Sequence, residues 1–151
     1  MPIEQSCIFC RILSGDVEAS FVYRDDLVTS FMDIHPLVRG HMLVIPNEHC
    51  ASIRDLNDTL SGHMFIIARR LMQAIRQSGI RSEGVNLFLA DGSAAGQTVF
   101  HCHVHVIPRF PGDGFKVRFP VNYGNRPSRD ELNETAELLK KALHSIPKSP
   151  G

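Results

Sequence analysis

Three histidines at alternate positions constrain this chain more than any other feature of its sequence. They are His101, His103 and His105, and they lie in residues 99–107, an apolar segment typical of a strand. Because successive side chains of a strand point to opposite faces, the three imidazoles are predicted to share one face. With eight histidines among 151 residues, chance does not explain this spacing. Imidazole can act as nucleophile, acid, base or ligand, so the row predicts a catalytic centre or a three-histidine zinc site.

Charge and hydropathy exclude several classes of protein. Sixteen Lys and Arg residues balance 16 Asp and Glu residues, so no net charge would attract nucleic acid or an anionic membrane. Every apolar run is far shorter than the ~18 residues of a membrane helix, and the start lacks the pattern of a secretion signal. We therefore expect a cytoplasmic protein without nucleic-acid or membrane partners. Residues 1–151 are predicted to form one domain with a loose tail at 147–151.

The predicted elements indicate an α+β fold with an antiparallel sheet. Short strands are expected at residues 21–24, 27–33, 41–46, 85–90 and 99–107. The first two are separated by only two aspartates, which is typical of a hairpin, and residues 110–127 are expected to form a surface loop. Strands joined by hairpins, without strict alternation of strand and helix, favour this fold class.

Two helices are predicted. Apolar residues recur at steps of three and four over residues 58–78, and Gly79 follows as a stop signal. A second helix is expected to begin after Ser128, because Glu131 completes a capping box. Its predicted buried stripe consists of Leu132, Ala136, Leu139 and Leu143.

A glycine-containing loop leads into the histidine row. Gly92 and Gly96 allow a tight turn whose backbone amides could converge on an anion, and Gln97 and Thr98 add an amide and a hydroxyl. The loop could equally be a plain connection between strands. Placed before a histidine row, it favours phosphate binding and attack of a neutral imidazole on phosphorus, which forms a phosphohistidine-type intermediate.

Cys7 and Cys10 form a Cys-x-x-Cys motif near the N-terminus. In a reducing compartment this spacing indicates a metal site or a redox pair, and the strand that precedes a thioredoxin-like motif is missing here. A structural zinc site would need histidines to complete four ligands. Two buried thiols without a metal are an equally good interpretation of the spacing. Cys50 and Cys102 are expected to be buried small residues.

Residues 96–109, Gly-Gln-Thr-Val-Phe-His-Cys-His-Val-His-Val-Ile-Pro-Arg, resemble the signature of the histidine triad (HIT) family, in which three histidines alternate with apolar residues. Residues 33–46 resemble the family's ribose-side strand pair, and Val85-Asn86 resembles its next strand. The resemblance spans residues 7–109. It implies a HIT-like fold with a five-stranded antiparallel sheet, one long helix and a C-terminal helix, acting as a homodimer. It also implies a nucleotidyl hydrolase or transferase acting on purine nucleoside phosphoramidates, adenylate esters or dinucleoside polyphosphates.

The resemblance also assigns roles to individual residues. His103 would attack the α-phosphorus, His105 would contact a non-bridging oxygen and help the leaving group depart, and His41 would support the imidazole network. Gln97 and Thr98 would hold phosphate and leaving group. The remaining substrate contacts would be Asn86 to phosphate, Asp33 to the ribose hydroxyls, and Ile8, Phe9, Phe31 and Ile34 to the base.

Small bacterial members of the family resemble this chain in their Cys-x-x-Cys motif. The likeness implies that a zinc ion, held by Cys7, Cys10, His49 and His101, pins the N-terminal segment 1–10 to the sheet and takes no part in catalysis. His101 would then have to leave the face that it shares with the other two histidines, and strand twist at the sheet end is the expected cause.

Other functions remain open at this point. The chain could be a nucleotide-binding regulatory module with incidental turnover, or a hydrolase that uses zinc on all three histidines. The choice between phosphoramidate and dinucleoside polyphosphate substrates is also open. His35, His63 and His144 receive no role.

Overall fold

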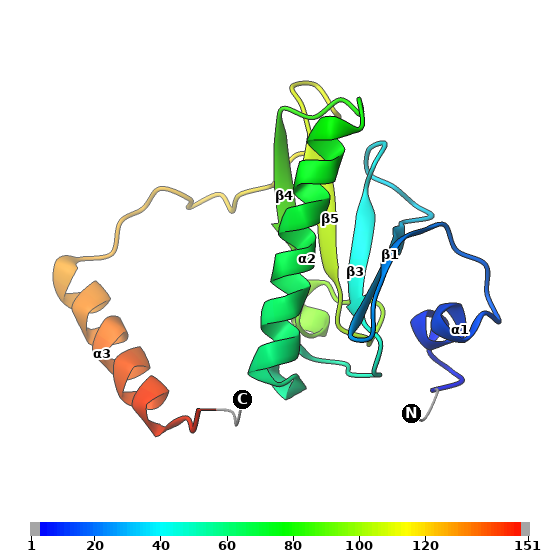
Figure 1. Cartoon of the computed structure of the whole chain (residues 1–151). Coiled ribbons are helices and arrows are strands. Elements are labelled where there is room, and N and C mark those ends of the chain that lie inside the picture. Colours follow the sequence, from blue (N-terminus) through cyan, green and yellow to red (C-terminus); the bar gives the residue numbers. More distant parts are fainter. Residues whose placement is uncertain (1–3, 149–151) are drawn as a thin grey trace. The chain divides into compact units, whose positions relative to one another are not determined.

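The computed structural model describes residues 4–148, which form two compact units, 4–114 and 115–148. The first unit contains a five-stranded antiparallel sheet with the strand order β1-β2-β3-β5-β4 (Figure 1). The predicted α+β fold class and five-stranded sheet are confirmed. The strands are β1 Phe21–Arg24, β2 Val28–Met32, β3 Met42–Pro46, β4 Gly84–Phe88 and β5 Val104–Arg109.

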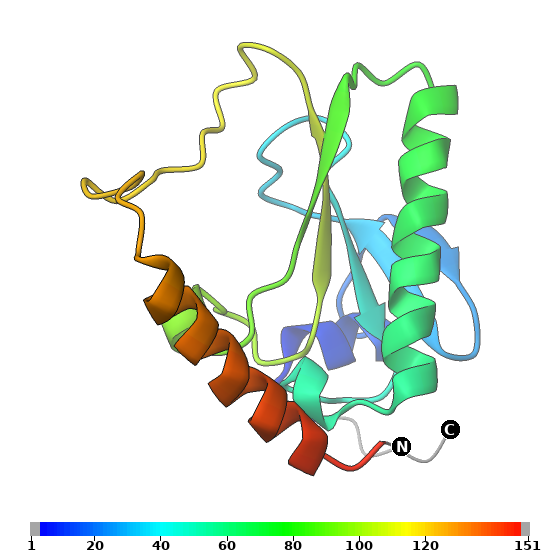
Figure 2. The same cartoon turned by 90° about the vertical axis from the view of Figure 1, so that its left-hand side faces the viewer.

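Helix α2, Asp58–Gln77, runs along one face of the sheet (Figures 1 and 2). The Asn57 side chain caps its N-terminus by accepting a hydrogen bond from Leu60 N at 2.8 Å. Gly79, with a φ of 79°, follows the last turn in the left-handed region that favours glycine. The helix predicted over 58–78 is confirmed.

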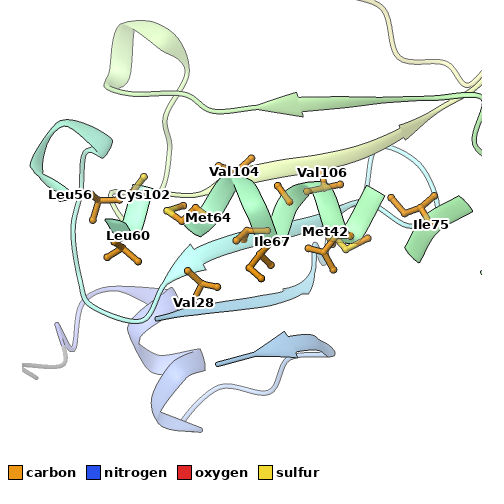
Figure 3. Packing of buried hydrophobic residues seen from close by; sticks show 13 residues of the cluster. Val28, Met42, Leu56, Leu60, Met64, Ile67, Ile75, Cys102, Val104 and Val106 are labelled. Carbon is orange, nitrogen blue, oxygen red and sulfur yellow. The ribbon is translucent and has the colours of Figure 1, made fainter. Parts of the chain in front are cut away.

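The sheet buries side chains on both faces, because β3 alternates between two hydrophobic clusters. Met42 and Val44 lie in the cluster beneath α2, where side chains of the helix and of β5 meet (Figure 3). Leu43 and Ile45 lie in the second cluster. Successive side chains of a strand point to opposite faces, so the second cluster covers the face away from α2.

Helix α1, Ile8–Ser14, closes the second cluster. Phe9 and Ile12 of this helix are buried against the Phe31 side chain of β2 and the residues of β3. Gly15, with a φ of 88°, ends the helix in the left-handed region. Helix α1 was not predicted, because it is seven residues long and the side chain of its N-cap residue, Cys7, does not cap the helix.

Strand β5 begins later than predicted. It starts at Val104 and not at residue 99, so His101 and His103 precede the strand, and the predicted row of three imidazoles on one strand face is wrong. The reason lies in the neighbouring strand β3, which ends at Pro46, a residue that has no N–H to continue the ladder. The Pro46 carbonyl instead accepts a hydrogen bond from His101 Nε2 at 2.9 Å.

The C-terminal unit, 115–148, contains helix α3, Arg129–Ser145. Its N-terminus has the predicted capping box, since Ser128 and Glu131 exchange hydrogen bonds. The predicted burial of its apolar stripe is wrong. Within this unit no second helix or strand covers the stripe, and Leu132, Ala136, Leu139 and Leu143 are exposed.

Two further predictions concern the whole chain. The assignment of residues 1–151 to one domain stays a prediction, and the end of the predicted tail, 149–151, lies outside the described residues. Among residues 4–148, no helix has the length and apolarity that a membrane span requires.

Candidate active site

A cavity of about 390 Å³ lies against α1, the ends of β2 and β4, and the start of β5. Its wall is mostly apolar, with a few polar groups, which is the composition of small-molecule sites. Eight of the residues predicted to form the substrate or catalytic site line it, namely His103, His105, Asp33, Thr98, Ile8, Phe9, Phe31 and Ile34.

The His103 ring is fixed with one nitrogen open for chemistry. Its Nδ1 lies 2.7 Å from the His101 carbonyl oxygen, so Nδ1 carries the proton and donates it. Nε2 is then the unprotonated atom of a ring that lines the cavity. Burial lowers the pKa of His103 below its ordinary value, which keeps the ring neutral at neutral pH. A neutral imidazole with a free Nε2 can attack phosphorus.

His41 and His105 form a hydrogen-bonded pair beside this ring. The Leu37 amide donates to His41 Nδ1 at 3.1 Å, so the His41 proton is on Nε2. That Nε2 lies 2.8 Å from His105 Nδ1, which must therefore accept. His105 carries its own proton on Nε2, and burial lowers its pKa to about 4. The pair thus holds a neutral His105 that can donate a hydrogen bond from Nε2 to a group in the cavity.

Asp33 connects this pair to the cavity. Its Oδ1 accepts a hydrogen bond from His35 N at 2.8 Å, and its Oδ2 lies 3.5 Å from His41 Nε2. The carboxylate oxygens keep lone pairs for further hydroxyl donors. Asp33, His41 and His105 also lie close enough to share a cation. The His41–His105 hydrogen bond and the Leu37 amide occupy ring nitrogens that a cation would need. We therefore interpret these residues as a hydrogen-bonded network and not as a metal site.

Two predicted phosphate-binding residues do not line the cavity. Gln97 is 6% exposed, and its amide is fully used, since Oε1 accepts from Gly92 N at 2.7 Å and Nε2 donates to the Ala51 and Val99 carbonyls. These hydrogen bonds hold the loop between Gly92 and Gly96 in place. The side-chain oxygen of Asn86, Oδ1, accepts a hydrogen bond from the Arg109 guanidinium at 2.6 Å. Only Thr98 of this group reaches the cavity.

A substantial part of the cavity wall was not predicted from the sequence. Val17, Glu18 and Ala19 follow α1 and line the cavity, and that short helix was not predicted. Phe88 pairs with His105 in the sheet, and their ring centroids are 5.9 Å apart. The apolar spacing of residues 8–12 was the available signal for α1. The other residues that were missed are Ile12, Met32, His35, Leu43, Ala90 and Val99.

A second cluster brings together all four predicted zinc ligands, Cys7, Cys10, His49 and His101. Their ligand atoms lie within 4.8 Å of one another. The sulfur of Cys10 is 3.3 Å from His49 Nδ1 and 3.7 Å from His101 Nδ1, and Cys7 Sγ is 3.5 Å from His101 Nδ1. Tetrahedral zinc bonds of ordinary length place sulfur and nitrogen about 3.6 Å apart. The donor set therefore fits zinc.

His101 is prepared as a ligand by its surroundings. Its Nε2 donates to the Pro46 carbonyl, so Nδ1 keeps the lone pair that faces the two sulfurs. Burial lowers the pKa of His101 to about 4, so the ring is neutral. In the described part of the chain, no metal-binding cluster unites His101 with His103 and His105. The alternative of a three-histidine zinc hydrolase therefore has no geometric support.

Fold and site together define an α+β protein with a histidine-based site beside an apolar cavity. The chain belongs to the HIT family, since the HIT domain matches residues 14–112. Protein hit of Bacillus subtilis is 34% identical over 146 residues, which cover 96% of this chain and all of that protein. The crystal structure of a HIT family protein from Bacillus anthracis has a TM-score of 0.83 and 34% identity, covering 91% of this chain and 97% of that chain.

Three further relatives bear on metal binding and activity. A Zn-bound histidine triad family protein from Mycobacterium smegmatis is 38% identical, with a TM-score of 0.69, and covers 91% of this chain and 97% of that chain. Adenylylsulfatase HINT3 of Arabidopsis thaliana is 27% identical over 145 residues, covering 96% of this chain and 73% of that protein. A histidine triad nucleotide-binding protein from Candida albicans is 28% identical, with a TM-score of 0.82, covering 93% and 99%. These relatives support a nucleotide hydrolase, and the first suggests zinc.

The lowered pKa of His105 predicts how stability depends on pH. The folded state keeps this ring neutral down to about pH 4, whereas an unfolded histidine takes up a proton near pH 6.5. Between these values the unfolded chain binds more protons, so the His105 contribution is complete above about pH 6.5 and is lost as the pH falls. Urea unfolding of wild type and His105→Gln at pH 7, 6 and 5 should show a steeper loss of stability in wild type. Equal slopes would contradict the prediction.

Proposed function

We propose that this protein cleaves the bond at the α-phosphorus of purine nucleoside phosphoramidates or dinucleoside polyphosphates, as a nucleotidyl hydrolase or transferase. The observation that carries the proposal is the pairing of a neutral His103, with Nε2 free, and a hydrogen-bond donor at His105 Nε2, both at the wall of one cavity. His103 carries its proton on Nδ1 and His105 carries its proton on Nε2, and a hydrogen bond sets each tautomer.

The reaction would proceed in two displacements. His103 Nε2 forms a bond to the α-phosphorus, the bond to the leaving group breaks, and the leaving nitrogen or oxygen, which accepts a hydrogen bond from His105 Nε2, takes a proton from solvent water. In the second step water attacks the nucleotidyl-histidine, the bond to His103 breaks, and the proton of the attacking water passes to solvent. Positioning and hydrogen-bond donors supply most of the rate of such phosphoryl transfers.

The cavity has the composition that a nucleoside monophosphate needs. Ile8 and Phe9 from α1 and Phe31 from β2 offer an apolar wall for a purine base. Asp33 has oxygen lone pairs for the ribose hydroxyls, and Thr98, which lines the same cavity as His103, would hold phosphate with its hydroxyl. Gln97 contributes indirectly, by holding the loop between Gly92 and Gly96. The contact of Asn86 with phosphate stays a prediction; its Nδ2 group would make the contact, because its Oδ1 accepts a hydrogen bond from Arg109.

A kinetic comparison of adenosine phosphoramidate with diadenosine tetraphosphate tests the proposal. We expect hydrolysis of at least one, with AMP as a product, and the ratio of the two kcat/KM values names the preferred bond. A chiral phosphorothioate substrate should show overall retention at phosphorus, since two inversions cancel. Inversion would exclude the covalent intermediate. Tight AMP binding without turnover of either substrate would instead support a regulatory nucleotide-binding module.

We also propose that Cys7, Cys10, His49 and His101 bind zinc in a structural role. The four ligands come from α1 and its N-cap, from the loop after β3 and from the segment before β5, so one ion would join three parts of the chain. All four cysteines of the chain are free. Reduced thiols in a ligand set are in keeping with the cytoplasmic location that we propose.

A homodimer is the assembly that we propose. Strand β4 lies at the sheet edge, its Phe88 is half exposed, and Phe65 and Ile66 of α2 are half exposed as well. Exposed edge strands and apolar patches are common sites of association. Sedimentation at micromolar concentration should give twice the 16.9 kDa of one chain. The mass of a single chain would contradict this prediction.

A further inference from the structure

The Phe9 ring lies between the metal-binding cluster and the catalytic nucleophile. Its centroid is 5.8 Å from the ring of His101 and 5.2 Å from the ring of His103, in edge-to-face geometry both times. The side chain is 7% exposed, and it also meets Phe31 edge to face at 5.5 Å. One side chain therefore contacts a predicted metal ligand, the nucleophile and the base-binding wall.

A second path joins the same two sites through the backbone. The carbonyl of His101 accepts the Nδ1 hydrogen bond of His103, and this bond selects the tautomer that leaves Nε2 free. The ring of His101 is itself held between the Cys7 sulfur and the Pro46 carbonyl. A shift of His101 would thus move both the ring that touches Phe9 and the carbonyl that orients His103.

A metal ion at the cluster would help to hold helix α1. It has seven residues and no side-chain cap, and isolated helices of this length are not stable in water. Cys7 is its N-cap residue and Cys10 lies in its first turn, so a metal bound to both sulfurs would fix the turn that carries Phe9. Without the ion, the first turn loses this anchor, and the ring of Phe9 is less firmly held against His103.

We propose that the metal cluster controls the reactivity of the substrate cavity, and that Phe9 is the positioning residue that couples the two. The proposal rests on the nucleotidyl-transfer function proposed above. It adds that metal occupancy at a site apart from the chemistry sets how well His103 is aligned and how firmly the base wall is formed. Small misplacements of a reacting group are costly, since about 1 Å can lower a rate by 10²-fold.

The test compares wild type with Phe9→Leu and with the matched control Phe21→Leu. Phe21 also meets Phe31 edge to face, at 6.4 Å, but it does not line the cavity, and no contact with His101 or His103 is seen. For each zinc-loaded and chelated protein, we would measure AMP affinity by calorimetry, kcat and KM for adenosine phosphoramidate, and amide hydrogen exchange over residues 8–14.

In wild type and Phe21→Leu, chelation should weaken AMP binding and lower kcat by about tenfold each, and should speed exchange in α1. In zinc-loaded Phe9→Leu, kcat should fall by a similar factor while the zinc content stays at the wild-type level. Chelation should then change the kcat and the AMP affinity of this variant by less than about threefold, since the coupling residue is already gone.

Three outcomes separate the proposals. Equal effects of chelation on Phe9→Leu and wild type would overturn the coupling and leave the proposed function intact. A kcat of zinc-loaded Phe9→Leu equal to that of wild type would also overturn it, and this measurement does not require the chelated protein to stay folded. Failure of the zinc-loaded wild type both to bind AMP and to hydrolyse the phosphoramidate would contradict the proposed function itself.

Discussion

Replacing His103 with alanine is expected to lower kcat for the preferred substrate by 10³-fold or more, on the order seen when other catalytic nucleophiles are removed. The reason is structural. His103 Nε2 is the unprotonated ring nitrogen that the geometry presents at the cavity, because His103 Nδ1 and His41 Nδ1 are held by backbone groups and His105 Nδ1 faces His41. Neither His41 nor His105 can take over the attack without reversing one of these hydrogen bonds. Measured kcat and KM for adenosine phosphoramidate check the prediction.

The control is His144→Ala. His144 lies on α3, where its ring binds the Lys140 carbonyl at 2.8 Å, and it belongs to the C-terminal unit. This variant should keep wild-type kcat. AMP binding separates loss of chemistry from loss of folding, since His103→Ala should still bind AMP in the cavity that α1 and Phe31 form. A His103→Ala protein that is folded and fully active would place the nucleophile elsewhere.

Local patterns in the sequence predict most of the fold. The 3.6-residue period of residues 58–78 predicts α2, and short apolar segments between turns predict the positions of all five strands to within a few residues. The start of β5 is the exception. The alternation of His101, His103 and His105 fits a strand. Pairing with β3 nevertheless ends at Val44 and Val104, because Pro46, the next residue of β3 that would donate to β5, has no N–H. A strand is decided by both partners, and a pattern within one segment carries no information on its partner.

The candidate site shows the same division between local and tertiary information. His103, His105 and Asp33, which spacing and family resemblance predict as site residues, line the cavity in the structure. The four predicted zinc ligands lie together as well. Gln97 and Asn86 are polar residues at plausible positions, but the Gln97 amide and the Asn86 side-chain oxygen already form hydrogen bonds within the fold. Whether an amide is free for a substrate depends on partners far along the chain, such as the Ala51 carbonyl 46 residues before Gln97.

Helix α1 explains why the base wall was only half predicted. The Cys-x-x-Cys motif was interpreted as a ligand pair, while the two residues between the cysteines were assigned to the base without an element to carry them. In the structure, α1 and its N-cap residue carry both sets of residues. Cys7 and Cys10 belong to the cluster of predicted zinc ligands, while Ile8 and Phe9 line the cavity. Tertiary packing stabilises a helix too short to form by propensity.

Replacing Cys10 with serine is expected to remove the bound zinc and to lower the free energy of unfolding by about 4 kcal/mol, the stabilisation that a ligand gives at a thousandfold excess over its Kd. Cys10 is buried, and its sulfur approaches both histidines of the cluster, so its loss breaks the tetrahedral set. Zinc content and urea unfolding would be measured on protein purified without chelator.

The matched control for this prediction is Cys50→Ser. Cys50 is half-buried, it lies outside the cluster, and its thiol donates to the Ser52 carbonyl at 3.2 Å, a bond that a serine hydroxyl can also make. We expect this variant to keep one zinc per chain and a free energy of unfolding close to that of wild type. Wild-type protein without zinc, or a Cys10→Ser protein as stable as Cys50→Ser, would refute a structural metal. The same pair of variants shows whether α1 needs the ion, because hydrogen exchange over residues 8–14 should rise in Cys10→Ser and not in Cys50→Ser.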